Sequence, residues 1–142
     1  MPSIPSFGPT SQFAKLSTLV YENRTIVTNA VAAAVTHTPA ELLSGVINRD
    51  ALSSARADLF PTAAAIVAAI NGCQVGTSFR TLIRNTGAGA GSITHTTNTG
   101  LTLVGTVVIV FQQQKEYLFI VTNVTPGQEA VTVISLGVSV AI

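Results

Sequence analysis

The chain of 142 residues has the length of one ordinary domain and can bury a core without metal ions or disulfides. Its net charge is only +1 and its seven basic residues are scattered, which excludes a broad electrostatic surface for nucleic acid or an anionic membrane. Charged residues make up 9% of the chain, against roughly a quarter in a typical soluble domain, and 47% are hydrophobic. Such a composition predicts a protein that is covered by other subunits; the alternative is a surface rich in Thr, Ser, Asn and Gln.

Residues 1–15 are expected to form an extended N-terminal arm, because Pro2, Pro5 and Pro9 fix φ and remove backbone donors. The arm is either a disordered tail or a segment that lies on a neighbouring subunit. The remaining residues, 16–142, are expected to form a single β-rich domain. The sequence predicts neither a signal peptide nor a membrane span, and we expect a protein made in a cytoplasm.

The first part of this domain is expected to be extended over residues 16–21 and 25–37, since β-branched residues recur there without a helix cap. A short helix should follow at Thr38-Pro39-Ala40-Glu41, where a capping Thr, a Pro at the first position and a Glu at the third form a strong start signal. Gly45 should end it. The main helix is expected at 61–71, opened by Pro61 or Thr62 and closed by Gly72, with an apolar face and a smooth alanine face.

Residues 77–142 change to a period of two, which is typical of strands. Phe79, Thr81 and Ile83 should share one face, and turns recur every eight to twelve residues. We therefore expect five or six short strands, with a break at Gly105 and a turn at Pro126-Gly127. The predicted fold class is mainly β: an antiparallel, jelly-roll-like β-sandwich or barrel with one main helix and the extended arm.

Three glycines at alternate positions, Gly87, Gly89 and Gly91, raise the question of a phosphate-binding loop. Such a loop needs a helix N-terminus just beyond it, and usually a lysine. The following residues, SITHTTNTG, instead favour a strand. The glycines are therefore predicted to form a hairpin loop between two antiparallel strands that ends near Asn85 and resumes near Ser92, with positive φ angles.

Few side chains suggest chemistry. His37 and His95 lack a third metal ligand in the sequence, and both are interpreted as hydrogen-bonded surface or interface residues, with His95 pointing away from the face of Ile93. Cys73, the single cysteine, is interpreted as a small apolar filler. We assign no catalytic, cofactor-binding or metal-binding residue and expect no cofactor.

The carboxylates offer two structural interpretations. Glu41 is expected to serve the helix cap. Arg49, Asp50, Arg56 and Asp58 alternate in sign in NRDALSSARAD, which predicts at least one Arg–Asp ion pair, within or between subunits.

Four stretches in order, AELLSGVINRD, ARADLFPTAAAIVAAI, VGTSFRTLIRNTG and IVTNVTPGQEAVTVISLG, resemble small virion structural proteins. These are the capsid decoration, minor capsid or surface proteins of tailed phages and large double-stranded DNA viruses. The resemblance covers roughly residues 25–137 and excludes the arm. It implies a β-rich fold, self-assembly as trimers, contact with neighbouring capsid proteins, a location in the virion and no enzymatic activity. We expect no nucleic acid, membrane or small-molecule partner; the alternative function is a fibre-head or receptor-binding protein of a virion.

Overall fold

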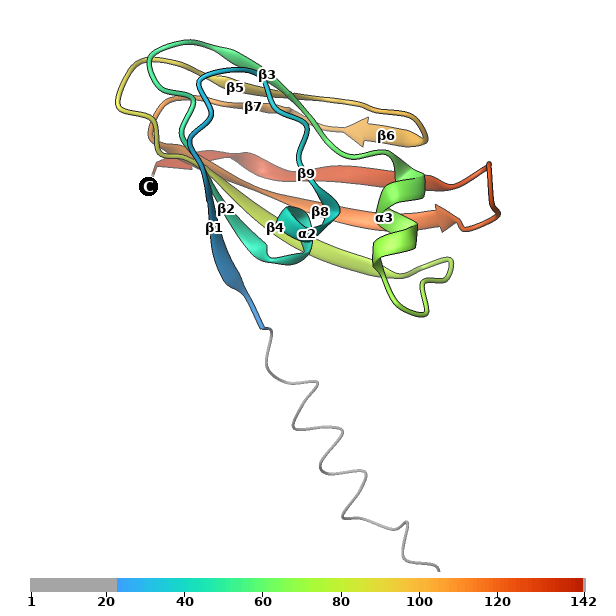
Figure 1. Ribbon diagram of the computed structural model, residues 1–142. Helices are drawn as coiled ribbons and strands as arrows, with labels where there is room; N and C mark the ends of the chain where they lie inside the picture. The colour runs from blue at the N-terminus through green and yellow to red at the C-terminus, as the bar shows by residue number, and fades with distance from the viewer. Residues whose placement is uncertain (1–22, 142) are drawn as a thin grey trace, which may run out of the picture.

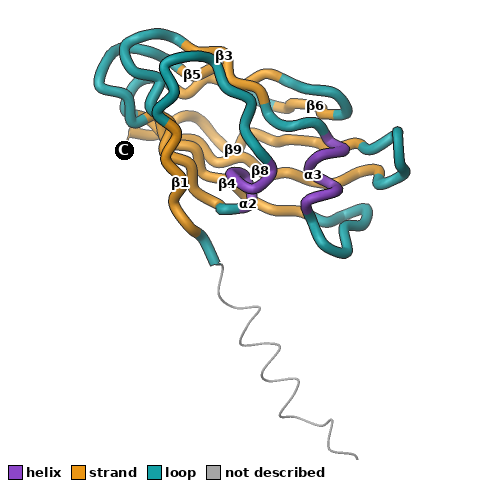
Figure 2. The backbone as a smooth tube through the Cα atoms, viewed as in Figure 1, coloured by secondary structure: helices purple, strands orange, loops and turns teal. Residues whose placement is uncertain are grey.

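The computed structural model describes residues 23–141, which form two packed β-sheets with two short helices (Figures 1 and 2). The mainly β, sandwich-like fold class is confirmed. The expected arm at 1–15 and the expected strand at 16–21 lie outside the described residues. The elements are β1 (Thr25–Asn29), α2 (Pro39–Leu43), β2 (Gly45–Arg49), β3 (Arg56–Leu59), α3 (Ala63–Ala69), β4 (Ser78–Asn85), β5 (Ile93–Thr96), β6 (Leu101–Val104), β7 (Val108–Ile109), β8 (Gln113–Asn123) and β9 (Ala130–Ala141).

The larger sheet has the strand order β1-β2-β4-β8-β9-β6, and the smaller sheet has the order β3-β5-β7. The strand pairing is mixed, whereas the sequence predicted an antiparallel arrangement. β4, β8 and β9 pair antiparallel, as does β5 with β7, but β1–β2, β2–β4, β3–β5 and β6–β9 are parallel. Parallel neighbours require long crossovers, and the connections that contain α2 and α3 supply two of them (Figure 1).

The core lies between the two sheets and is built by alternation along β4 and β8. Lys115, Tyr117, Phe119 and Val121 of β8 all point inward. The prediction for β4 is confirmed, since Thr81 and Ile83 are fully buried and Phe79 packs against the core. Phe60, which follows β3, lies at the centre and meets the rings of Tyr117 and Phe119 edge-on, each with centroids 5.3 Å away.

Both helices begin where the sequence predicts. At α2, the Glu41 amide donates to the Thr38 hydroxyl over 3.2 Å and the Glu41 carboxylate accepts from the Thr38 amide over 2.7 Å, which is the expected capping box. At α3, Thr62 caps the amide of Ala65, while Ala63 and Ile66 face the core. No helix within residues 23–141 is long and apolar enough to cross a membrane.

The segment 30–37 departs from the extended structure expected for 25–37. β1 ends at Asn29, and the chain then runs irregularly until a single parallel bridge joins Thr36 to Leu59. Two of its backbone carbonyls, those of Val31 and Ala33, accept hydrogen bonds from the buried Arg49 side chain of the larger sheet. Hydrogen bonds to its carbonyl groups and one bridge therefore hold this segment, which forms no continuous strand.

The glycine loop lies where it was expected, between the end of β4 at Asn85 and the start of β5 at Ile93. It is not a hairpin, because β4 and β5 belong to different sheets. Gly87, Gly89 and Gly91 also lack the predicted positive φ angles. They are required for close approach instead: a Cβ on Gly89 would lie 2.6 Å from the Cα of Ser53. The loop thus crosses between the sheets by pressing on the backbone of residues 52–54.

We therefore predict that Gly91→Ala lowers the free energy of unfolding by about 1–3 kcal/mol, because the new methyl group would collide with the backbone carbonyl of Ser54. Urea denaturation measures the effect. Ala90→Ser, at an exposed position of the same loop, is the control and should stay within about 0.5 kcal/mol of the wild type. Equal, small effects at both positions would show that the loop does not pack on residues 52–54.

Candidate functional site

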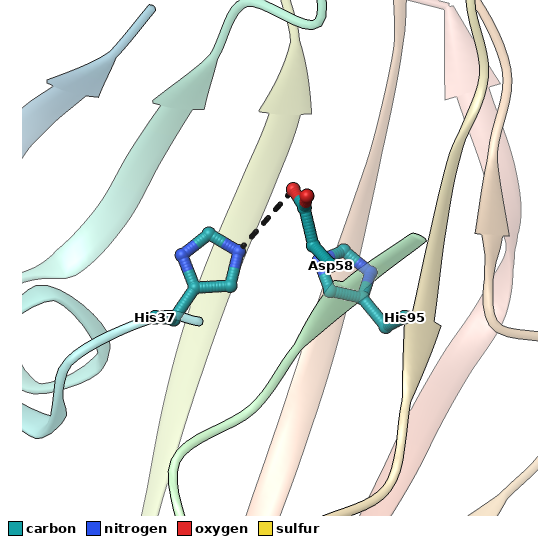
Figure 3. Close-up of side chains that lie close together, drawn as sticks. All are labelled: His37, Asp58 and His95. Carbon is teal, nitrogen blue, oxygen red and sulfur yellow. Dashed lines mark ion pairs between the residues drawn. The ribbon is translucent and has the colours of Figure 1, made fainter. Parts of the chain in front are cut away.

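Three polar side chains meet in the interior: His37, Asp58 and His95 (Figure 3). They come from the segment before α2, from β3 and from β5. Each offers one possible ligand atom, and these atoms lie within 4.8 Å of one another. All three residues are at most 1% exposed. The sequence prediction of surface or interface histidines is therefore wrong.

Strand register brings these residues together. In the parallel pairing of β3 with β5, Asp58 lies beside His95. Ile93 and His95 are both buried, so the prediction that His95 points away from the face of Ile93 is also wrong: residues two apart on a strand share a face. His37 is held next to β3 because its backbone amide donates to the Leu59 carbonyl over 2.9 Å.

Asp58 is anchored by Arg49, which confirms the predicted Arg–Asp pair and places it within the subunit. The guanidinium donates from Nε to Oδ2 over 2.7 Å and from Nη2 to Oδ1 over 3.2 Å. Its other donors reach the backbone carbonyls of Val31, Ala33 and Asp50 over 2.6–2.8 Å. All five N–H groups are thus used, as a fully buried arginine requires.

His95 is held by ring contacts and one side-chain hydrogen bond. Its ring stacks on Phe60 with centroids 4.7 Å apart and planes 6° from parallel. Its Nδ1 lies 3.0 Å from the hydroxyl of Tyr117, which in turn donates to the Val107 carbonyl over 3.3 Å. When the Tyr117 proton points to that carbonyl, Nδ1 of His95 carries a proton and Nε2 carries the lone pair. Nε2 has no hydrogen-bond partner in the described residues.

His37 makes no side-chain hydrogen bond to the described residues, although both of its ring nitrogens are buried. Its Nδ1 lies 3.7 Å from Oε2 of Glu41, and its Nε2 lies 3.8 Å from Oδ2 of Asp58. Both distances exceed the range of a hydrogen bond. The Glu41 carboxylate thus lies between the cap of α2, where it accepts a hydrogen bond, and the Nδ1 side of the His37 ring.

Both histidines are held in the neutral form. Burial lowers the pKa of His37, an effect that the nearby carboxylates of Asp58 and Glu41 only partly oppose. Burial also places the pKa of His95 well below its usual range, and the neighbouring His37 lowers it further. The cluster consequently contains the Arg49–Asp58 ion pair, whose two charges cancel, and two uncharged imidazoles. The free ring nitrogens of these imidazoles can bind a cation or a proton.

Other candidates from the sequence lie elsewhere. Cys73 packs, partly buried, against the edge of the core, as the filler interpretation predicts. A surface cavity of about 250 Å³ is lined by the two residues before β1, by the end of α2 and by the first residues of β2 and β4, and shares none with the cluster. Arg56 makes no ion pair within residues 23–141. Asp58, its nearest acidic neighbour in the sequence, pairs with Arg49 instead. Sequence reasoning missed the third partner of the histidines, Asp58, because only strand register brings it to them.

Comparisons with family models, curated protein sequences and solved structures find no match to this chain. Function is therefore inferred from the sequence, the geometry and the composition of the chain.

Removing the partner of Asp58 should be costly. We predict that Arg49→Met lowers the free energy of unfolding by about 3–5 kcal/mol, because it leaves a buried carboxylate without its counter-charge. Arg80→Met is the matched control: the Arg80 side chain is 53% exposed, lies 4.0 Å from Glu116, and should contribute less than about 1 kcal/mol. Chemical denaturation of both variants would decide, and similar costs would contradict a central role for the buried pair.

The histidines predict acid destabilisation. Their folded-state pKa values lie below the ordinary value of about 6.5, so below that pH the unfolded chain binds more protons than the folded one. The free energy of unfolding should be insensitive to these groups well above pH 6.5 and fall as the pH drops through and below that value. Thermal melts across this window measure the slope, and the double variant His37→Gln/His95→Gln should flatten it. An unchanged slope would assign it to other groups.

Proposed function

We propose that this protein is a structural component of a virion, a capsid decoration or minor capsid protein that self-assembles as a trimer and binds neighbouring capsid proteins. In this role it carries no catalytic activity and takes no small-molecule substrate. The resemblance of its sequence supports the class. The observation that carries the proposal is the position of the exposed apolar residues.

The two edge strands of the larger sheet both expose apolar side chains. Ile26 of β1 is 64% exposed, and Val104 of β6 is 48% exposed. An edge strand also presents unpaired backbone groups, and proteins that remain monomeric usually protect such edges with charge, proline or a covering segment. Neither β1 nor β6 contains a charged residue or a proline. These edges are therefore suited to pairing with another subunit.

A second surface supports close subunit contact. α3 turns Ala63 and Ile66 to the core, and its outward alanines, Ala64, Ala68 and Ala69, are exposed. A face without long side chains lets another chain approach closely and order few rotamers, so little side-chain entropy is lost on contact. The polar cluster, in contrast, is enclosed in the core, which supports a structural rather than a catalytic role for it.

We expect the purified protein to sediment as a trimer at micromolar concentration. Ile26→Lys should shift the protein toward monomer, because it places a charge on the β1 edge where an apolar contact is proposed. Val75→Lys is the matched control, since Val75 is similarly exposed, at 62%, but lies in the turn after α3. Both variants are checked for folding by circular dichroism.

Sedimentation of the wild type as monomer alone, at every micromolar concentration tested, would contradict self-assembly. Equal effects of the two lysine substitutions would contradict the assignment of the interface to the β1 edge. Neither result would bear on the fold, because Ile26 and Val75 are both exposed and their substitution should leave the core intact.

A further inference from the structure

We propose that His37, Asp58 and His95 bind one divalent transition-metal ion, with Zn²⁺ the best match, and that this ion ties the segment 30–38 to β3 and β5. The site is independent of the proposed assembly role, because all three side chains belong to one subunit and lie in its interior (Figure 3).

Unpartnered ring nitrogens are the first feature that indicates a bound ion. Nδ1 and Nε2 of His37 and Nε2 of His95 are buried without a hydrogen-bond partner in the described residues. A buried polar atom without a partner normally costs about 1–3 kcal/mol, so such atoms are rare in folded proteins. Here they come from two neighbouring rings, whose centroids are 5.5 Å apart, beside one carboxylate. A bound cation would satisfy one nitrogen of each ring at once.

The groups around the histidine rings also suit a metal site. A metal-binding histidine usually donates its other ring N–H to an oxygen, which fixes the tautomer and the ring orientation. His95 has such a partner in the Tyr117 hydroxyl, 3.0 Å from Nδ1, and this leaves Nε2 as the ligand atom. For His37, the Glu41 carboxylate lies 3.7 Å from Nδ1, on the side opposite the Asp58 contact of Nε2.

The Asp58 carboxylate can accept one more bond than it makes in the structure. An ionised carboxylate accepts about four hydrogen bonds, two on each oxygen. Oδ1 accepts two, from Arg49 and from the Val35 amide, whereas Oδ2 accepts only one, from Arg49. The free position is therefore on Oδ2, the same oxygen that lies 3.8 Å from Nε2 of His37.

Ligand type selects the ion. Two imidazoles with one carboxylate suit Zn²⁺, Co²⁺ or Ni²⁺, whereas Ca²⁺ and Mg²⁺ prefer oxygen ligands alone. Ligand atoms bound tetrahedrally at about 2.1 Å lie about 3.4 Å apart, so the rings must move inward by about 1 Å from their present separation. Three protein ligands leave a fourth position for water. The neutral state of both histidines at pH 7 leaves their lone pairs available to the ion.

The chain makes the test unusually direct, because His37 and His95 are its only histidines and Cys73 its only cysteine. Untagged full-length protein is denatured with a chelator, refolded with Co²⁺ alone or Zn²⁺ alone, and passed through a gel-filtration column. Elemental analysis gives metal per chain, Co²⁺ absorption reports tetrahedral nitrogen and oxygen ligands, and thermal melting reports stabilisation. We expect one ion per chain and a higher melting temperature with Zn²⁺.

Variants separate this site from others. His37→Gln and His95→Gln should each abolish binding, and Tyr117→Phe, which keeps the ring but removes the partner of Nδ1, should weaken it by about 10–100-fold. Cys73→Ser should bind as the wild type does. Refolded wild type without bound metal would overturn the proposal, as would unaltered binding by both histidine variants or loss of binding in Cys73→Ser. The wild-type result stands even where a variant fails to fold.

Discussion

The fold depends on the buried contact between Arg49 and Asp58. A charge inside a protein is tolerated only when its partners are complete, and here one guanidinium uses all five donors. Its four acceptor residues lie in three places: just after β2, in the segment 30–37, which supplies two carbonyls, and in β3. Arg49 thereby joins the larger sheet to the smaller one and holds an irregular segment that no strand pairing supports. Only the native arrangement brings these acceptors together, which makes the pair a source of specificity as well as of stability.

Other features of this end of the molecule follow from that contact. With β3 fixed by Asp58, its parallel register with β5 sets His95 beside the carboxylate, and the bridge at Thr36 brings His37 to the other side. The turn after β2 is fixed by two hydrogen bonds to Asp50. The Asp50 carbonyl accepts one from Arg49, and the Asp50 side chain accepts the other from the Leu52 amide over 2.7 Å. The glycine loop then presses on this fixed turn.

Local signals in the sequence predicted what depends on near neighbours. The capping box at Thr38, the main helix, the alternation of β4 and an Arg–Asp pair near residue 50 are all confirmed. The parallel pairings and the change of sheet after Asn85 were missed, because they depend on contacts across long crossovers. The histidine cluster was missed for two reasons. First, Asp58 meets His95 through strand register, which the sequence does not show. Second, the alternation was misapplied: His95 lies two residues after Ile93 on the same strand, so it shares the buried face of Ile93.

The placement of charge links the core to the surface. The chain has only 13 charged residues, from seven basic and six acidic ones, and three of those within residues 23–141, Arg49, Asp58 and Lys115, are buried. The outside is therefore even poorer in charge than the composition indicates, while Ile26 and Val104 lie exposed at the two sheet edges. A protein that uses its few charges to fix its own interior keeps little electrostatic protection against association. The interior thus specifies one arrangement of the chain and the edges favour contact, a division of roles that would suit the proposed structural subunit.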